Sequence, residues 1–166
     1  MRYTIPWDQE IMSTRVKIIG LTGNIATGKS VVRRMLANSG ALGLDSDWIA
    51  HRMLYPEGPA FHPVIEIFGE DLLTENGEIS RQKLGEIVFS NPRKLSQLEE
   101  LTHPLVTKSI IKRIEASTCP VAAIEAIKLL ESDLVGICDT IWVSHTSTES
   151  QIKRLMTARG MTRENA

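Results

Sequence analysis

Four short runs of apolar residues have the length and composition of β-strands. They are residues 16–21 (VKIIGL), 41–44 (ALGL), 121–124 (VAAI) and 140–143 (TIWV). A helical pattern separates the first two runs, and a strand–helix–strand order is typical of a parallel sheet covered by helices. The pattern therefore predicts an α/β fold.

The first predicted helix begins near Lys29 and ends at Gly40, which suits a helix C-terminus. Its expected apolar face consists of Val31, Val32, Met35 and Leu36, opposite Arg33 and Arg34. Near the other end of the chain, residues 146–149 (TSTE) have the spacing of a capping box. They predict a last helix that runs to Arg159.

The middle of the chain, residues 48–117, shows helical patterns and turns but no convincing strand. Asn76-Gly77 predicts the turn of a small hairpin. Asn91 and Pro92 are the expected N-cap and first residue of a helix. We expect Pro104 to interrupt that helix, because the residue before a proline is disfavoured in the α conformation.

These elements divide the chain into two expected parts. Residues 15–50 and 118–166 form an α/β core with a lid region at its end, and residues 51–117 form a helical insertion. Residues 1–14 form a polar leader without periodicity and without the apolar region of a signal peptide.

Composition narrows the class of protein. The chain has 166 residues, 42% of them hydrophobic and 23% charged, as expected for one globular unit. Its formal charge of −1 provides no basic field for nucleic acid or a membrane surface, so we expect neither as a partner. No apolar stretch has the length of a membrane span, and the two cysteines form no CxxC pair. We expect a cytoplasmic protein.

A glycine-containing loop follows the first predicted strand and matches the pattern G-x-x-x-x-G-K-[ST] in full. Glycines let successive backbone N–H groups turn towards phosphate oxygens, and the helix that follows adds its positive dipole end. We expect Lys29 to reach the β- and γ-phosphates of ATP, and the Ser30 hydroxyl to bind Mg²⁺. The expected phosphate-binding residues are Gly23, Asn24, Ile25, Ala26, Thr27, Gly28, Lys29 and Ser30.

The loop predicts a P-loop NTPase-type sheet flanked by helices, with a helical insertion. The absence of the base-reading motif N-K-x-D argues against a GTP switch protein. The size and the insertion favour a small-molecule kinase. Such kinases bring lid arginines onto the transferred phosphoryl group, and Arg154 and Arg159 on the last predicted helix are the candidates.

Three carboxylates follow predicted strands, where the ligand crevice of an open α/β sheet lies. Asp45 is expected to have a supporting role. Asp47 either receives the proton of an attacking hydroxyl or, like Ser46, caps a helix. Glu125 either contributes to the Mg²⁺ shell, as in a Walker B strand, or is a solvated residue.

Two histidines, His51 and His103, lie in the expected helical insertion. His51 follows Asp47 by four residues, so the two share a helix face, although a lone surface histidine is the simpler interpretation. The same two interpretations apply to His103, but its position in the insertion favours a substrate contact.

The chain resembles the dephospho-CoA kinase family from about residue 16 to its end. Residues 19–30 (IGLTGNIATGKS) are similar to the family's I-G-L-T-G-G-I-G-S-G-K-S, and residues 45–51 (DSDWIAH) to D-A-D-x-I-A-H. Phe68-Gly69, Arg81-x-x-Leu84, Val88-Phe89, Leu98-Glu99, His103-Pro104-x-Val106, Gln151-x-x-Arg154-Leu155 and Arg159 follow in the family's order.

The resemblance implies transfer of the γ-phosphoryl group of ATP to the 3′-hydroxyl of the ribose of dephospho-CoA, with Mg²⁺. It implies that Asp47 activates the acceptor, with Lys29 and Arg154 as the other catalytic residues. It also implies that the insertion binds CoA, with His51, Arg81 and His103 on the substrate side. Lys128 departs from the family, in which leucine is common. We expect a monomer or a weak oligomer.

The family also has last helices and a strand that hold the ATP base and complete the lid, and these are expected beyond Ala166. We therefore expect a 166-residue form to bind ATP more weakly than a longer form and to turn over slowly or not at all. Two alternatives stay open: another small-molecule kinase of the shikimate-kinase type, and a truncated nucleotide-binding protein without activity.

Overall fold

The centre of the molecule is a four-stranded sheet of β1 (Lys17–Thr22), β2 (Leu42–Asp45), β3 (Val121–Glu125) and β4 (Thr140–Val143). The strands follow the order β2-β3-β1-β4, and every neighbouring pair is parallel. This computed structural model describes residues 15–166, so the leader expected at residues 1–14 lies outside the described residues. The predicted α/β class with a parallel sheet is confirmed.

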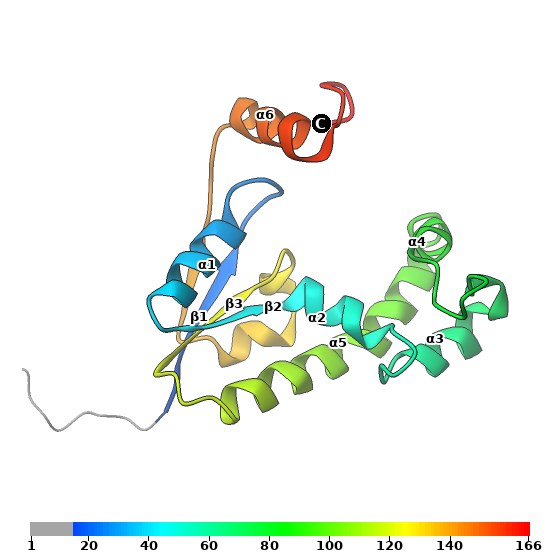
Figure 1. Ribbon diagram of the computed structural model, residues 1–166, viewed down its shortest axis with the longest axis horizontal. Coiled ribbons are helices and arrows are strands. Elements are labelled where there is room, and N and C mark those ends of the chain that lie inside the picture. Colours follow the sequence, from blue (N-terminus) through cyan, green and yellow to red (C-terminus); the bar gives the residue numbers. More distant parts are fainter. Residues whose placement is uncertain (1–14) are drawn as a thin grey trace, which may run out of the picture.

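Helices surround this sheet and extend away from it (Figure 1). Helix α1 (Lys29–Asn38) connects β1 to β2 and lies against one face of the sheet. Between β2 and β3 the chain forms α2 (Ser46–Met53), α3 (Phe61–Phe68), α4 (Arg81–Phe89) and α5 (Pro92–Glu115). Helix α6 (Thr148–Arg159) follows β4 and stands over the loop between β1 and α1 (Figure 1).

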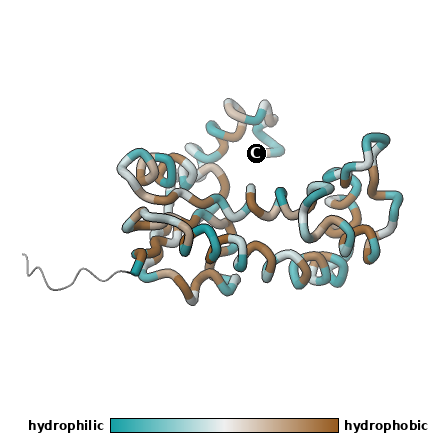
Figure 2. Tube along the Cα trace, turned by 60° about the horizontal axis from the view of Figure 1, so that its bottom comes forward, coloured by the Kyte–Doolittle hydropathy of each residue, from teal (hydrophilic) through white to brown (hydrophobic). Residues whose placement is uncertain are grey.

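One hydrophobic core joins the sheet to the helices that extend from it. Its buried cluster includes Ile18 and Ile124 from the sheet, Ile49 from α2, and Ile110 from α5. Hydrophobic positions gather in the strands and along the helices, while hydrophilic positions follow the turns (Figure 2). In residues 15–166 no helix is both long and apolar enough to span a bilayer. The shared core of β1, β3, α2 and α5 fixes α2, which carries Asp47, relative to the sheet.

Several local predictions are confirmed. Asn91 caps α5 with its side chain, and Pro92 is the first helical residue. Leu73 and Ile79 form an antiparallel bridge around the Asn76-Gly77 turn. Gly40 has a positive φ of 96° just after α1, a conformation that glycine adopts without strain.

The predicted interruption at Pro104 is wrong, because α5 is one continuous helix of 24 residues. Its buried positions Thr102, Val106, Ile110 and Ile114 recur every four residues, so one apolar stripe passes the proline. Pro104 itself lies on the exposed side. Packing of the whole stripe against α2 and α4 outweighs the missing backbone donor.

The expected face of α1 is also partly wrong. Val31 and Met35 are exposed, whereas Arg33 turns inwards to carboxylates at the strand ends. Hydrophobicity alone predicts that Val31 and Met35 face the sheet. Arg33 faces it instead, because ion pairs with Glu125 and Asp45 stabilise its charge there.

Two helix caps differ from expectation. Asp45, rather than Ser46 or Asp47, caps α2 by accepting a hydrogen bond from the Trp48 N–H at 2.9 Å. In α6 the cap is Ser147, one residue later than the capping-box spacing requires. Glu149 is therefore misplaced for a capping box, and it pairs with Arg163 instead.

Candidate active site

The loop between β1 and α1 has the backbone of a phosphate cradle. Gly23 and Gly28 have φ angles of 138° and 106°, in the left-handed region that favours glycine. A Cβ on Gly23 would lie 2.3 Å from the carbonyl oxygen of Ser144, so a side chain there is excluded. Helix α1 begins at Lys29, and its free N–H groups lie at this loop. The geometry can bind an anion of the size of a phosphate group.

Ala26 is a departure within the cradle. Its φ is 58°, the one positive φ among the non-glycine residues that the structure describes. The dephospho-CoA kinase motif has glycine at this position, for which this conformation carries no strain. An alanine there costs about 1–2 kcal/mol. The loop therefore keeps its phosphate-binding shape at the expense of stability.

Lys29 is buried, and its side chain turns back over the loop. Its Nζ donates hydrogen bonds to the carbonyl oxygens of Gly23 at 2.8 Å and Asn24 at 2.9 Å. Neutral carbonyls are its hydrogen-bond partners, so a positive charge remains available to phosphate oxygens.

The far side of the loop is fastened to the end of β4. The hydroxyl of Thr27 donates to the Asn24 carbonyl at 2.8 Å and lies 2.6 Å from the hydroxyl of Ser144. The Ser144 N–H in turn donates to the Thr22 carbonyl at 2.8 Å. These bonds hold the cradle rigid before any ligand arrives.

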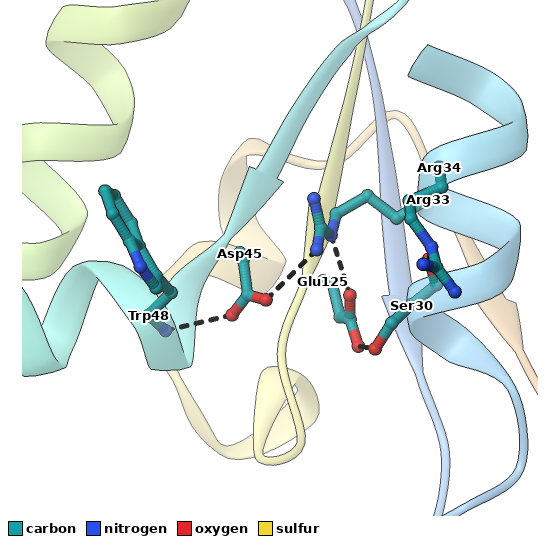
Figure 3. A network of polar contacts seen from close by, with 6 residues as sticks. All are labelled: Ser30, Arg33, Arg34, Asp45, Trp48 and Glu125. Atoms are coloured by element: carbon teal, nitrogen blue, oxygen red, sulfur yellow. Dashed lines mark hydrogen bonds and ion pairs between the residues drawn. The ribbon is translucent and has the colours of Figure 1, made fainter. Parts of the chain in front are cut away.

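Polar side chains meet where α1 faces the carboxyl ends of β2 and β3 (Figure 3). The Ser30 hydroxyl donates to Glu125 Oε1 at 2.5 Å, and Arg33 Nε donates to Glu125 Oε2 at 2.7 Å. Arg33 Nη2 also bonds Asp45 Oδ2 at 3.1 Å. Glu125 is only 6% exposed, so its interpretation as a solvated residue is wrong.

Asp47 lies in the first turn of α2, where its residue surface is exposed at the edge of the cavities that it lines. Burial raises the pKa of this carboxyl, and the negative charges of Asp45 and Glu125 raise it further, against smaller lowering effects of His51 and Lys29. A carboxylate whose pKa is raised is a better proton acceptor than an ordinary aspartate. The environment therefore suits Asp47 to the work of a general base.

One cavity of about 290 Å³ brings most of the predicted site residues together. Its lining includes Lys29, Ser30, Asp47, His51, Glu125 and Arg159, with Ile25 and Ala26 from the loop. A second cavity, of about 660 Å³, lies between the loop, α1 and α6, and both Arg154 and Arg159 line it. Arg154 Nη1 donates to the Ala26 carbonyl at 2.9 Å. The two arginines thus lie beside the phosphate cradle.

The other predicted substrate residues lie towards the helices. His51 Nε2 and Arg81 Nη2 are 2.9 Å apart, and both line a separate cavity beside Tyr55. Burial lowers the pKa of His51, and the Arg81 charge lowers it further, which keeps the imidazole neutral at pH 7. His103 lines yet another cavity, of about 290 Å³, together with Asp47.

Two residues of the site were not assigned a role there from sequence. Arg33 was placed on the polar face of α1, yet it contacts both Glu125 and Asp45. Its spacing of three from Ser30 is the signal that could have identified it, because residues three apart share a helix face. Lys128 Nζ lies 2.8 Å from Glu99 Oε1, and both residues line the cavity of His103. The two residues are 29 positions apart in the sequence, so no local pattern predicts this ion pair.

A phosphate cradle at a strand–helix junction, with a poised carboxylate in the same cavity, defines the class of P-loop kinases. The sequence model of the dephospho-CoA kinase family matches residues 17–166, and the chain belongs to that family. It is 44% identical to a dephospho-CoA kinase of Carboxydothermus hydrogenoformans, over 90% of this chain and 74% of that protein. It is 40% identical to one of Streptomyces avermitilis, over 89% and 73% of the two chains.

Solved structures agree with this assignment. The dephospho-CoA kinase from Campylobacter jejuni superposes with a TM-score of 0.62 at 26% identity, covering 89% of this chain and 75% of that one. TT1252 from Thermus thermophilus gives a TM-score of 0.80 at 28% identity, covering 91% and 76%. The chain is thus a kinase of this family, with ATP and dephospho-CoA as the family's substrates.

Proposed function

We propose that the chain transfers the γ-phosphoryl group of ATP to the 3′-hydroxyl of the ribose of dephospho-CoA, which gives coenzyme A. The observation that carries this proposal is the single cavity that Asp47 shares with Lys29 and Ser30 of the cradle. An acceptor hydroxyl in this cavity would meet a proton acceptor on one side and the terminal phosphate on the other. The family match favours this acceptor over that of a shikimate-kinase-type enzyme.

The cradle and α6 divide the binding of ATP between them in this proposal. Backbone N–H groups of residues 23–30 hold the phosphates, and Lys29 leaves the loop carbonyls to bind the β- and γ-oxygens. Arg159 lines the reaction cavity itself, so its charge can offset the charge that develops on the transferred group. Arg154 supports it from the carbonyl of Ala26.

Magnesium fits the oxygen atoms at the base of the cradle. The Ser30 hydroxyl and the Glu125 carboxylate are 2.5 Å apart and face the phosphate loop. No group of three acidic, histidine or cysteine side chains in residues 15–166 forms a complete metal site. Mg²⁺ usually binds through few protein ligands together with substrate phosphates, so Ser30 and Glu125 suffice in this proposal. The ion would neutralise charge on the phosphates.

Asp47 acts on the acceptor side. It accepts the proton of the ribose hydroxyl and orients that oxygen in line with the γ-phosphate. The cavity that it shares with His103 reaches from α2 to α5 and can take part of the acceptor. His51 and Arg81 extend the acceptor side along α2 and α4.

In this proposal, each of the two parts of the chain binds one substrate. Residues 15–50 and 118–166 bind the nucleotide, and residues 51–117 bind the CoA part. Asp47 lies where the two parts meet, at the turn from β2 into α2.

The test is a coupled assay of ADP release with dephospho-CoA, with shikimate and adenosine as alternative acceptors. We expect turnover with dephospho-CoA alone and formation of one CoA per ADP. Lys29→Ala should weaken ATP binding by about 1.5–3 kcal/mol, because a charge-assisted contact is lost. Lys17→Ala, at an exposed position, is the matched control. ADP release without phosphorylation of dephospho-CoA would refute the proposal.

A further inference from the structure

Arg33 joins three elements of the active site through one side chain. It extends from α1, bonds Glu125 at the end of β3 at 2.7 Å, and bonds Asp45 at the end of β2 at 3.1 Å (Figure 3). Its own side chain is only 20% exposed. Such a guanidinium is held in one place by its two partners.

The Arg33 side chain lies over β2 beside Gly43. A Cβ built on Gly43 would lie 3.4 Å from Arg33 Cγ and 3.7 Å from Nη1, which are ordinary van der Waals distances. The arginine therefore follows the surface of the strand on its way to the two carboxylates.

The two carboxylates that it contacts need a counter-charge. Asp45 and Glu125 are direct partners in the register of β2 and β3, so their negative charges lie side by side. The Glu125 side chain is 7% exposed, and a buried carboxylate is costly unless it is paired. The two oxygens of Glu125 are held separately, one by Ser30 and one by Arg33.

On the basis of the proposed kinase function, we propose that Arg33 is a positioning residue for phosphoryl transfer. It balances the charges of Glu125 and Asp45 beside the bound phosphates, and it keeps Glu125 turned towards the Ser30 hydroxyl. Through Asp45, which caps α2, it also fixes the turn that carries Asp47. Charge balance and orientation are separable functions, because lysine retains the charge but lacks the planar fork that bonds two carboxylates at once.

The experiment compares Arg33→Met and Arg33→Lys with Arg34→Met as the matched control. Arg34 is the neighbouring arginine and is exposed, and its side chain donates a hydrogen bond to the carbonyl of Ser30 in its own helix, at 3.2 Å. Calorimetry with ATP in magnesium-free buffer measures charge balance without any turnover. Steady-state kinetics with Mg²⁺ and dephospho-CoA measures orientation as a fall in kcat.

We expect Arg33→Met to weaken magnesium-free ATP binding by about tenfold and to lower kcat by about 10- to 100-fold. Arg33→Lys should bind ATP normally yet keep the loss of kcat, and Arg34→Met should change neither. Should Arg33→Met fail to fold, Arg33→Met combined with Glu125→Gln restores the charge balance. That double variant should bind magnesium-free ATP normally and stay slow.

Equal losses in Arg33→Met and Arg34→Met would overturn the proposal, as would a wild-type kcat in Arg33→Lys. If the wild-type protein binds ATP but fails to phosphorylate dephospho-CoA, the proposed function fails, while the calorimetric series still decides whether Arg33 balances the charge.

Discussion

The surroundings of Asp47 disfavour its charge. Two further carboxylates, Asp45 and Glu125, raise its pKa together with burial. A chain selected for stability alone has no reason to place a third acid there. The proposed role of Asp47 as a base is a functional reason, and a loss of stability at a functional site is common in enzymes.

The raised pKa of Asp47 predicts how the stability of Asp47→Asn depends on pH. Because the folded pKa lies above the ordinary value of 3.8, Asp47 favours folding when protonated. That contribution is fully present below pH 3.8 and is lost as the pH rises through the folded pKa. We expect Asp47→Asn to unfold at higher urea concentration than wild type at pH 7, with a difference that shrinks towards pH 4. Asp71→Asn, at an exposed position, should show no such difference.

Ala26 leads to a second prediction at this scale. Ala26→Gly should raise the free energy of unfolding by about 1 kcal/mol, because the residue adopts a left-handed conformation that strains alanine. The same change at Ala37, inside α1, should lower it by about 0.5–1 kcal/mol. Urea unfolding measures both. A loss of stability in Ala26→Gly would show that the loop conformation carries no such strain.

At the scale of elements, the four strands and the strand–loop–helix unit of the cradle follow from sequence, because short apolar runs and the loop pattern are local signals. The direction of the Arg33 side chain does not, since it depends on carboxylates 12 and 92 residues away. The continuity of α5 through Pro104 likewise depends on packing against α2 and α4. The clustering of Asp47 with the cradle could be expected from the rule that strand ends meet, whereas the burial of Glu125 could not.

Helix α5 offers a prediction of its own. Pro104→Ala should raise the free energy of unfolding by about 1–3 kcal/mol, because it restores a helical hydrogen bond and removes the clash of the ring. Pro92→Ala, at the first residue of the same helix, should change stability by less than about 0.5 kcal/mol, since no donor is lost there. Thermal unfolding of the two variants and of the wild type measures both changes in stability. Equal effects would mean that the interior proline costs α5 nothing.

On the scale of the whole molecule, the cradle and the cavity lined by Asp47 and His103 belong to one folded unit. The buried cluster runs from Ile18 in β1 through Ile49 in α2 to Leu84 in α4. The turn from β2 into α2 lies between the two sides, and Asp45 and Asp47 belong to it. In the proposed mechanism, Asp47 acts on the transfer step and not on the binding of either substrate.

The most direct test of the central claim is the rate of one turnover in Asp47→Asn, measured by rapid quench with ATP and dephospho-CoA both bound. Calorimetry of each substrate on the same variant is the control. The account predicts transfer slower than wild type by about 10²- to 10⁴-fold, with both substrate affinities close to wild type. Transfer at the wild-type rate would contradict it.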